Sequence, residues 1–117
     1  MTVLRIVPDI GSDNPEESKA FFRDVLGLDV AMDQGWIITF TSTETTRPQV
    51  SVMSGGGSGT PVPDISIEVD DVDAIYAKAR AAGCDIVYAI TDEPWGVRRF
   101  YVRDPAGKLL NILAHKD

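Results

Sequence analysis

The residue types that most often carry out catalysis in proteins are scarce in this chain and lie far apart. His115 is the only histidine and Cys84 the only cysteine, and they belong to unrelated segments. Nucleophilic triads and dyads need their members within hydrogen-bond reach, so we predict neither a serine nor a cysteine nucleophile. We expect His115 to be a solvated tail residue and Cys84 to pack as a small hydrophobe. Catalytic residues are therefore not assigned.

Aromatic and basic residues offer another kind of chemistry, the binding of a planar ligand. Trp36 and Trp95 each lie next to a glycine, and each indole is either a stacking surface or part of a core or interface. Arg99 shares a strand face with Tyr101, where its guanidinium either meets an anionic group or pairs with nearby carboxylates. Residues 55–59 are glycine-rich but lack the lysine and the helix of a phosphate-binding loop, so they predict a flexible linker.

The elements that must position these side chains follow one order twice. We expect a strand over residues 3–9, a helix over 15–26 and extended segments near 28–32, 36–42 and 49–53. The order then returns as a strand over 64–69, a helix over 71–82 and strands near 85–90, 97–103 and 109–114. The helix exits GLDV at 27–30 and GCDI at 83–86 also match, which indicates an internal duplication. We predict a single domain over 1–117 with two βαβββ modules, 1–54 and 64–117, joined by a linker at 55–63.

The alternation of side chains along the strands predicts which way each residue faces. Ile65 and Ile67 alternate with Asp64 and Ser66, so the apolar pair should lie under a helix and the polar pair on the opposite face. By the same rule Asn111 faces away from the helix. The polar faces of the modules would then curve around a cleft.

The composition narrows the classes of partner. Lysine and arginine number 11 against 18 aspartates and glutamates, and the formal net charge of −7 disfavours nucleic acid and anionic lipid surfaces. No run of 18 apolar residues exists to span a bilayer, and the N-terminus does not have the pattern of a signal peptide. One cysteine suits a reducing compartment, so we expect a cytoplasmic protein without membrane or nucleic-acid partners.

Several segments resemble the vicinal oxygen chelate superfamily, which includes glyoxalase I, extradiol dioxygenases, fosfomycin-resistance transferases and bleomycin-binding proteins. The most specific are PWG at 94–96 and FYVRDPAG at 100–107, and the first helix with its exit and the run IEVDDVD at 67–73 agree. The resemblance implies the α+β glyoxalase/bleomycin resistance/dihydroxybiphenyl dioxygenase-like fold, two βαβββ modules forming a curved mixed sheet around a cleft. It also implies a homodimer whose clefts are shared between chains, with or without exchange of modules.

Enzymes of this superfamily hold a divalent metal at four positions, which the resemblance places at Val7, Ser51, Asp64 and Asn111. Only Asp64 is a good ligand, because valine has no donor atom and serine and asparagine are weak ones. We therefore expect no metal cofactor. A metal-dependent lyase, isomerase or dioxygenase acting on a substrate with vicinal oxygens remains the alternative.

The function that these residues favour is the binding of a small organic molecule in the cleft between the modules. We expect the ligand to stack on Trp36 and Trp95. Asp64, Ser66 and Asn111 of the helix-free face would hold its polar groups, and the strand residues Arg99 and Tyr101 would complete the contacts. A planar, partly cationic ligand suits aromatic faces beside carboxylates. A structural or partner-binding module without any ligand is the third class that the sequence leaves open.

Overall fold

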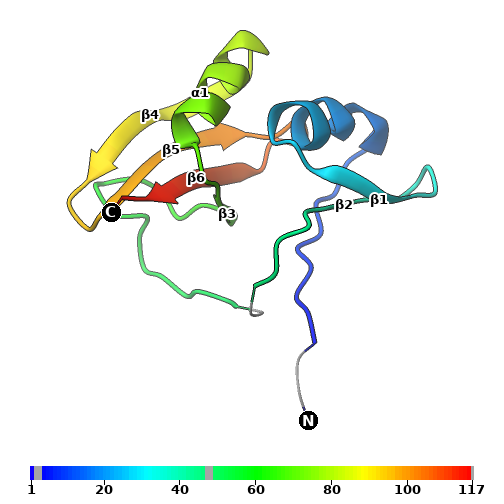
Figure 1. Ribbon diagram of the computed structural model, residues 1–117, viewed down its shortest axis with the longest axis horizontal. Coiled ribbons are helices and arrows are strands. Elements are labelled where there is room, and N and C mark those ends of the chain that lie inside the picture. Colours follow the sequence, from blue (N-terminus) through cyan, green and yellow to red (C-terminus); the bar gives the residue numbers. More distant parts are fainter. Residues whose placement is uncertain (2–3, 47–48, 117) are drawn as a thin grey trace.

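The computed structural model describes residues 1, 4–46 and 49–116, and its main layer is a mixed sheet of four strands. The strands are β3 (Ile65–Glu68), β4 (Asp85–Glu93), β5 (Val97–Arg103) and β6 (Leu109–His115), in the spatial order β3-β6-β5-β4 (Figure 1). β3 runs parallel to β6, and the other neighbours are antiparallel. These are the strands expected in the second module, with β4 continuing to Glu93 because it stays paired with β5 up to the turn.

One helix, α1 (Val72–Ala81), covers one face of this sheet. It begins where the Asp71 carboxylate accepts a hydrogen bond from the Ala74 backbone N–H at 3.1 Å, which caps the first turn. Val72 and Ala79 are buried against the sheet in one cluster with Leu110 and Ile112. The predicted facing of the apolar strand residues towards the helix is therefore confirmed.

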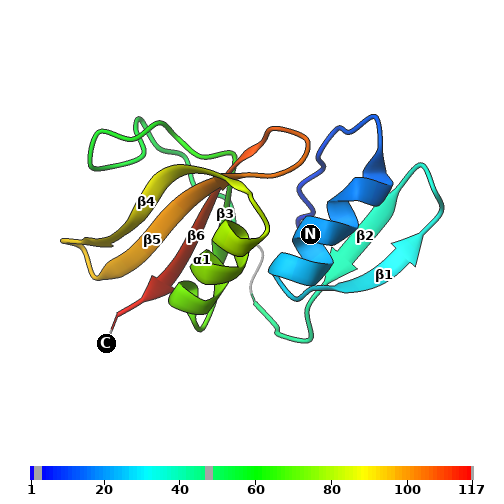
Figure 2. The ribbon, with the colours of Figure 1, turned by 90° about the horizontal axis from the view of Figure 1, so that it is seen from above.

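The first half of the chain is less regular. A 3₁₀ turn (Pro15–Glu17) precedes a π-helical segment (Ala20–Val25), where a continuous helix over 15–26 was expected. β1 (Asp29–Asp33) and β2 (Ile38–Thr41) form an antiparallel hairpin. Phe21 and Phe22 lie in the same apolar cluster as Val72, so the two halves share one core, and Figure 2 shows them side by side.

The two outer strands expected in the first half are not formed. Residues 4–9 and 49–53 contain no strand, and residue 3 lies outside the described residues. Both segments lie below the helices and strands in Figure 1, and no described strand pairs with them. Leu4, Val50 and Val52 are consequently exposed. The α+β class and the mixed sheet are otherwise as predicted, and no described helix is long and apolar enough to cross a bilayer.

Candidate functional site

A cleft of about 360 Å³ opens on the side of the four-stranded sheet that α1 does not cover. Arg99 and Asn111 point into this side because they alternate along β5 and β6 with Phe100 and Ile112, which pack towards the helix. The lining comprises two strand residues, one turn residue and a wall from the preceding segment: Arg99, Asn111, Trp95, Met53, Gly55, Gly56, Gly57 and Pro63.

The buried guanidinium of Arg99 is the electrostatic centre of this site. Its Nε and Nη2 lie 3.1 Å and 2.9 Å from Oε2 of Glu93, and both side chains are almost fully buried. Glu93 also accepts hydrogen bonds from the hydroxyls of Ser58 (2.8 Å) and Tyr88 (3.0 Å). The pair is thus a buried salt bridge whose carboxylate is fully hydrogen-bonded, the arrangement in which such pairs are tolerated. Of the alternatives left open for Arg99, the structure shows pairing with a carboxylate.

The same guanidinium holds the glycine strap, as we call residues 55–60. Nη1 donates to the carbonyl oxygen of Gly56 at 2.9 Å, and Nη2 donates to that of Gly57 at 3.3 Å. Thr60 Oγ1 lies 2.9 Å from the Tyr101 hydroxyl. A segment whose composition predicts flexibility is therefore anchored to β5 by buried contacts, and it forms one wall of the cleft.

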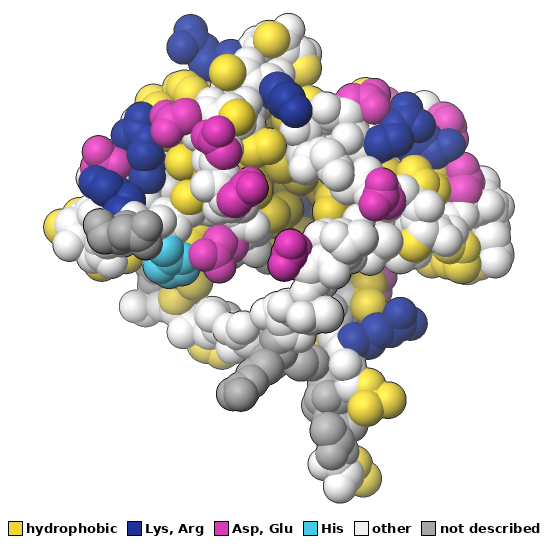
Figure 3. Space-filling model, in the orientation of Figure 1, with side chains coloured by type: hydrophobic (Ala, Val, Ile, Leu, Met, Phe, Trp, Pro, Cys, Tyr) yellow, Lys and Arg dark blue, Asp and Glu magenta, His cyan; other side chains and the backbone are white. Residues whose placement is uncertain are grey.

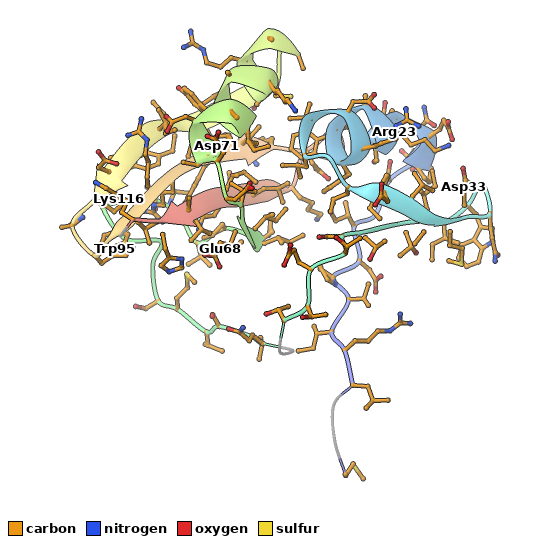
Figure 4. All side chains as sticks on the ribbon, viewed as in Figure 1. Arg23, Asp33, Glu68, Asp71, Trp95 and Lys116 are labelled. Atoms are coloured by element: carbon orange, nitrogen blue, oxygen red, sulfur yellow. The ribbon has the colours of Figure 1, made fainter. Side chains whose placement is uncertain are left out.

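Trp95 stands at the turn between β4 and β5, at one end of the sheet (Figure 4). Its ring lies 5.0 Å from the guanidinium carbon of Arg99, a cation–π contact, and its edge lies against Gly57. The side chain remains about half exposed, at 51%. An indole that is fixed on one side and open on the other is a surface on which a planar molecule can stack.

A row of polar side chains crosses the sheet next to the cleft, and Asn111 is its member that lines the cleft. Ser66 of β3, Asn111 of β6, Tyr101 of β5 and Tyr88 of β4 are register partners on neighbouring strands. The Asn111 amide Nδ2 donates to Ser66 Oγ at 3.1 Å, whereas its Oδ1 is buried without a partner among the described residues. Tyr101 is completely buried, so it supports Arg99 and the strap rather than lining the cleft.

The side chain of Asp64 binds a backbone group and does not face the cleft. Its Oδ2 accepts a hydrogen bond from the Leu109 N–H at 2.8 Å, which fixes the start of β6 beside β3. It is not part of the cleft lining.

Trp36 lies apart from the other residues proposed for the cleft. It occupies the turn between β1 and β2, is 76% exposed, and follows Asp33, which Figure 4 labels on the opposite side of the molecule from Trp95. Of the seven residues selected from the sequence, the structure brings Trp95, Arg99 and Asn111 together at the cleft. Tyr101 is buried beneath Arg99, and Ser66 is exposed beside Asn111 on the neighbouring strand.

The four positions at which relatives would hold a metal do not fit one here. Val7 and Ser51 lie on the exposed segments outside both sheets, and one Asp64 carboxylate oxygen is taken by a backbone N–H. Within residues 1, 4–46 and 49–116 no three histidine, cysteine, aspartate or glutamate side chains gather in a way that would hold an ion. His115 pairs with Glu68 at 2.7 Å on the exposed end of β6, away from these positions.

The remaining candidates are structural. Cys84 packs against the apolar cluster, and burial raises the pKa of its thiol, which is the behaviour expected of a small hydrophobe. Arg103 of β5 pairs with Asp85 of β4 at 3.7 Å. In Figure 3, hydrophobic side chains lie between the two halves, with acidic side chains on both sides of them.

Sequence reasoning missed three residues of the site, namely Glu93, Ser58 and Thr60. Glu93 ends β4 only three residues after the expected end of that strand, so a longer strand would have placed it opposite Val97 and near Arg99. The contacts of Ser58 and Thr60 with β4 and β5 span 35 and 41 residues, and no local pattern announces them.

Comparison with known proteins agrees with this architecture. The model of the Glyoxalase/Bleomycin resistance protein/Dioxygenase superfamily matches residues 3–112. The chain belongs to this superfamily. Among curated proteins it is 43% identical over 65 residues to uncharacterized proteins of Mycobacterium bovis and Mycobacterium tuberculosis, a match that covers 50% of this chain and 42% and 38% of those proteins. The match thus spans about two fifths of the length of these relatives.

Several solved structures share the fold over almost the whole chain. TioX from a Micromonospora strain superposes with a TM-score of 0.65 at 24% identity, covering 97% of both chains. TnmS3, an antibiotic-binding protein from a Streptomyces strain, superposes with a TM-score of 0.68 at 20% identity, covering 99% of this chain and 98% of its own. A superfamily member from Sphaerobacter thermophilus gives 0.68 at 19%, covering 98% of each chain. At these identities the likeness concerns the fold.

Proposed function

We propose that this chain binds a small organic molecule in the cleft beside Trp95 and that it does so without metal catalysis. The observation that carries the proposal is the half-exposed indole, which is held from behind by Arg99 and faces a cleft of ligand size. Ligand sites are concave and mostly apolar, with a few placed polar groups. Met53, Pro63 and the glycine wall supply the apolar part, and Asn111 supplies the polar part.

A protein of the same fold supports this type of function, since TnmS3 is described as antibiotic-binding. Another protein of the same fold is described as a lactoylglutathione lyase, so the proposal of a site without metal rests on this chain's own residues. The donor set at the family's ligand positions points the same way, since Val7 and Ser51 are poor ligands and Asp64 binds a backbone N–H. Elemental analysis that found near-stoichiometric metal, lost in Asp64→Ala, would favour a metal-dependent lyase, isomerase or dioxygenase instead.

The proposal includes a homodimer in the cytoplasm. Residues 4–9 and 49–53 are extended, unpaired and rich in exposed apolar side chains, with Val52 exposed at 97%. Unpaired extended segments favour strand pairing with another chain, and a second copy is the partner that the family resemblance implies. Because Met53 ends one of these segments and lines the cleft, pairing there would also complete the site. Light scattering should give the mass of a dimer at micromolar concentration, and a monomer mass would contradict this part.

The test of the function is a thermal-shift screen of antibiotics and planar metabolites, with and without divalent metal ions. A ligand at a hundred times its dissociation constant stabilises the folded protein by about 2.7 kcal/mol. Trp95→Ala should abolish the shift of any hit. Trp36→Ala, which removes the more exposed indole of the distant hairpin turn, is the matched control and should leave the shift unchanged.

Two outcomes would contradict the proposal. If hits bind Trp95→Ala as tightly as the native protein, the ligand site is elsewhere. If no compound stabilises the protein and no metal is found, the chain is a structural or partner-binding module.

A further inference from the structure

The hydrogen-bonding groups that line the cleft restrict which ligands it can bind. Given the proposed function, on which this step rests, we infer that its ligand is a planar molecule that carries an N–H or O–H donor and no anionic group. The donor would be recognised by Oδ1 of Asn111 and the plane by Trp95. Arg99, although it lines the cleft, would position these elements and would not bind the ligand's charge.

The first observation is that Arg99 has no N–H group left for a ligand. A guanidinium carries five N–H donors. Here Nε donates to Glu93, Nη1 donates to Gly56 O and to the Tyr101 hydroxyl, and Nη2 faces Glu93 and Gly57 O. Five N–H groups therefore meet five acceptor contacts, and a carboxylate or phosphate in the cleft would have to displace one of them.

Displacement is unfavourable because of where the acceptors lie. Glu93 is buried, and separating it from Arg99 would leave a charge without compensation. Releasing the Gly56 carbonyl would leave this buried acceptor with only the 3.5 Å contact to the Tyr101 hydroxyl and would loosen the wall of the cleft itself. The net charge of −7 further opposes an anion. An anionic ligand therefore gains nothing from the arginine that lines its site.

The second observation concerns Asn111. Its side chain is more than nine-tenths buried and lines the cleft, its Nδ2 donates to Ser66, and its Oδ1 has no donor within the part of the chain that the structure describes. Buried polar atoms in native proteins are nearly always hydrogen-bonded, and an exception calls for a missing partner. Of the other lining side chains, Met53 and Pro63 are apolar, Trp95 offers its ring, and the N–H groups of Arg99 are already occupied. An N–H or O–H group on the ligand would supply the donor that Oδ1 of Asn111 lacks.

Three naphthalene probes of similar size separate the effects of a hydrogen-bond donor, an acceptor and an anionic group on binding. 2-Naphthol carries an O–H donor, 2-methoxynaphthalene replaces it with an acceptor alone, and 2-naphthoate carries an anion. Each is titrated into the ¹⁵N-labelled native protein, and binding is read from the indole N–H signal of Trp95 and the side-chain amide signals of Asn111. The native protein should bind 2-naphthol about three- to tenfold more tightly than 2-methoxynaphthalene, the effect of one neutral hydrogen bond. 2-Naphthoate should bind no more tightly than 2-methoxynaphthalene.

Two variants assign the preference to one atom. Asn111→Leu keeps the approximate volume and removes the acceptor, so 2-naphthol and 2-methoxynaphthalene should bind it equally. Ser66→Ala is the matched control, because it removes the other hydrogen bond of the same amide and leaves Oδ1 in place. It should retain the preference for 2-naphthol, and the backbone amide spectrum reports whether each variant is folded.

The outcomes separate this inference from the proposed function. Equal binding of 2-naphthol and 2-methoxynaphthalene to the native protein, or tightest binding of 2-naphthoate, overturns the inference and leaves a ligand-binding cleft. A preference for 2-naphthol that persists in Asn111→Leu also overturns it. If none of the probes moves the Trp95 signal, the planar-ligand cleft is wrong and both proposals fall.

Discussion

Replacing Arg99 with methionine tests the account of the site most directly, because it removes a buried charge and keeps most of the side-chain volume. The side chains of Arg99 and Glu93 are only 5% and 2% exposed, so solvent cannot compensate the carboxylate that remains. Breaking a buried pair from one side costs about 3–5 kcal/mol. The carbonyl oxygen of Gly56 also loses its shortest hydrogen bond, whereas that of Gly57 keeps the N–H and the hydroxyl of Thr60 as donors.

The size of the effect in a melting experiment follows from the chain length. With an unfolding entropy of about 2.1 cal/mol/K per residue, 117 residues give about 0.25 kcal/mol/K. A loss of about 3–5 kcal/mol then lowers the melting temperature by about 12–20 °C. The measurement is thermal unfolding followed by circular dichroism at pH 7, with every variant at one protein concentration because association shifts melting temperatures.

Two further variants make the result decisive. Arg98→Met removes the neighbouring arginine of β5, whose ion pairs with Asp73 and Asp92 lie in solvent, and should lower the melting temperature far less. The double variant Glu93→Gln with Arg99→Met removes both buried charges and should recover a large part of the loss. Equal losses in Arg98→Met and Arg99→Met, or no recovery in the double variant, would refute the buried pair as the anchor of the strap.

Three other measurements test separate parts of the structure. Gly57→Ala adds a Cβ only 2.8 Å from the nearest carbon of the neighbouring indole at a φ of +82°, whereas Gly59→Ala meets no atom within 4 Å at a similar φ of +75°. Gly57→Ala should therefore lower the melting temperature more and shift the tryptophan emission; equal effects would show that the strap does not contact the ring. Burial raises the pKa of the Cys84 thiol, so Ellman's reagent at about pH 8 should react more slowly with the folded than with the urea-unfolded protein, and equal rates would contradict its packing. The hydrogen bond from Arg98 holds the pKa of Asp92 below its usual value, so this carboxylate stabilises the fold above about pH 4 and the contribution disappears as pH falls through the lowered pKa. Asp92→Asn should accordingly melt below the native protein at pH 6 and level with it in strong acid, and a constant difference would argue against the ion pair.

The second module was predictable because its signals are local. The alternation in β3 and β6 placed Ile65 and Ile112 under the helix, and the capping Asp71 and the glycine that follows the helix set its two ends. The run that closes the hairpin between β5 and β6 carried the family resemblance, and the superfamily match confirms it. Periodicity and capping depend on residues a few positions apart, so both can be recognised in the sequence.

The first half was harder to predict because its outer segments have apolar alternation without a partner inside the chain. A strand needs a neighbour to receive its hydrogen bonds, and the described residues offer none to 4–9 or 49–53. The sequence pattern records the preference for an extended chain, while the presence of a neighbouring strand is a property of the tertiary or quaternary arrangement.

The sequence by itself determined the fold family, the facing of Asn111 and Ser66, and the poor quality of the metal positions. Only the tertiary structure decided that Arg99 is occupied by Glu93 and by the glycine strap, and that Trp95 rather than Trp36 stands at the cleft. The contact between Arg99 and Gly56 joins residues 43 positions apart. Composition made the strap look flexible because glycine has no side chain to bond, yet its backbone carbonyls are the acceptors that a buried guanidinium requires, and their pairing depends on the path of the chain through space.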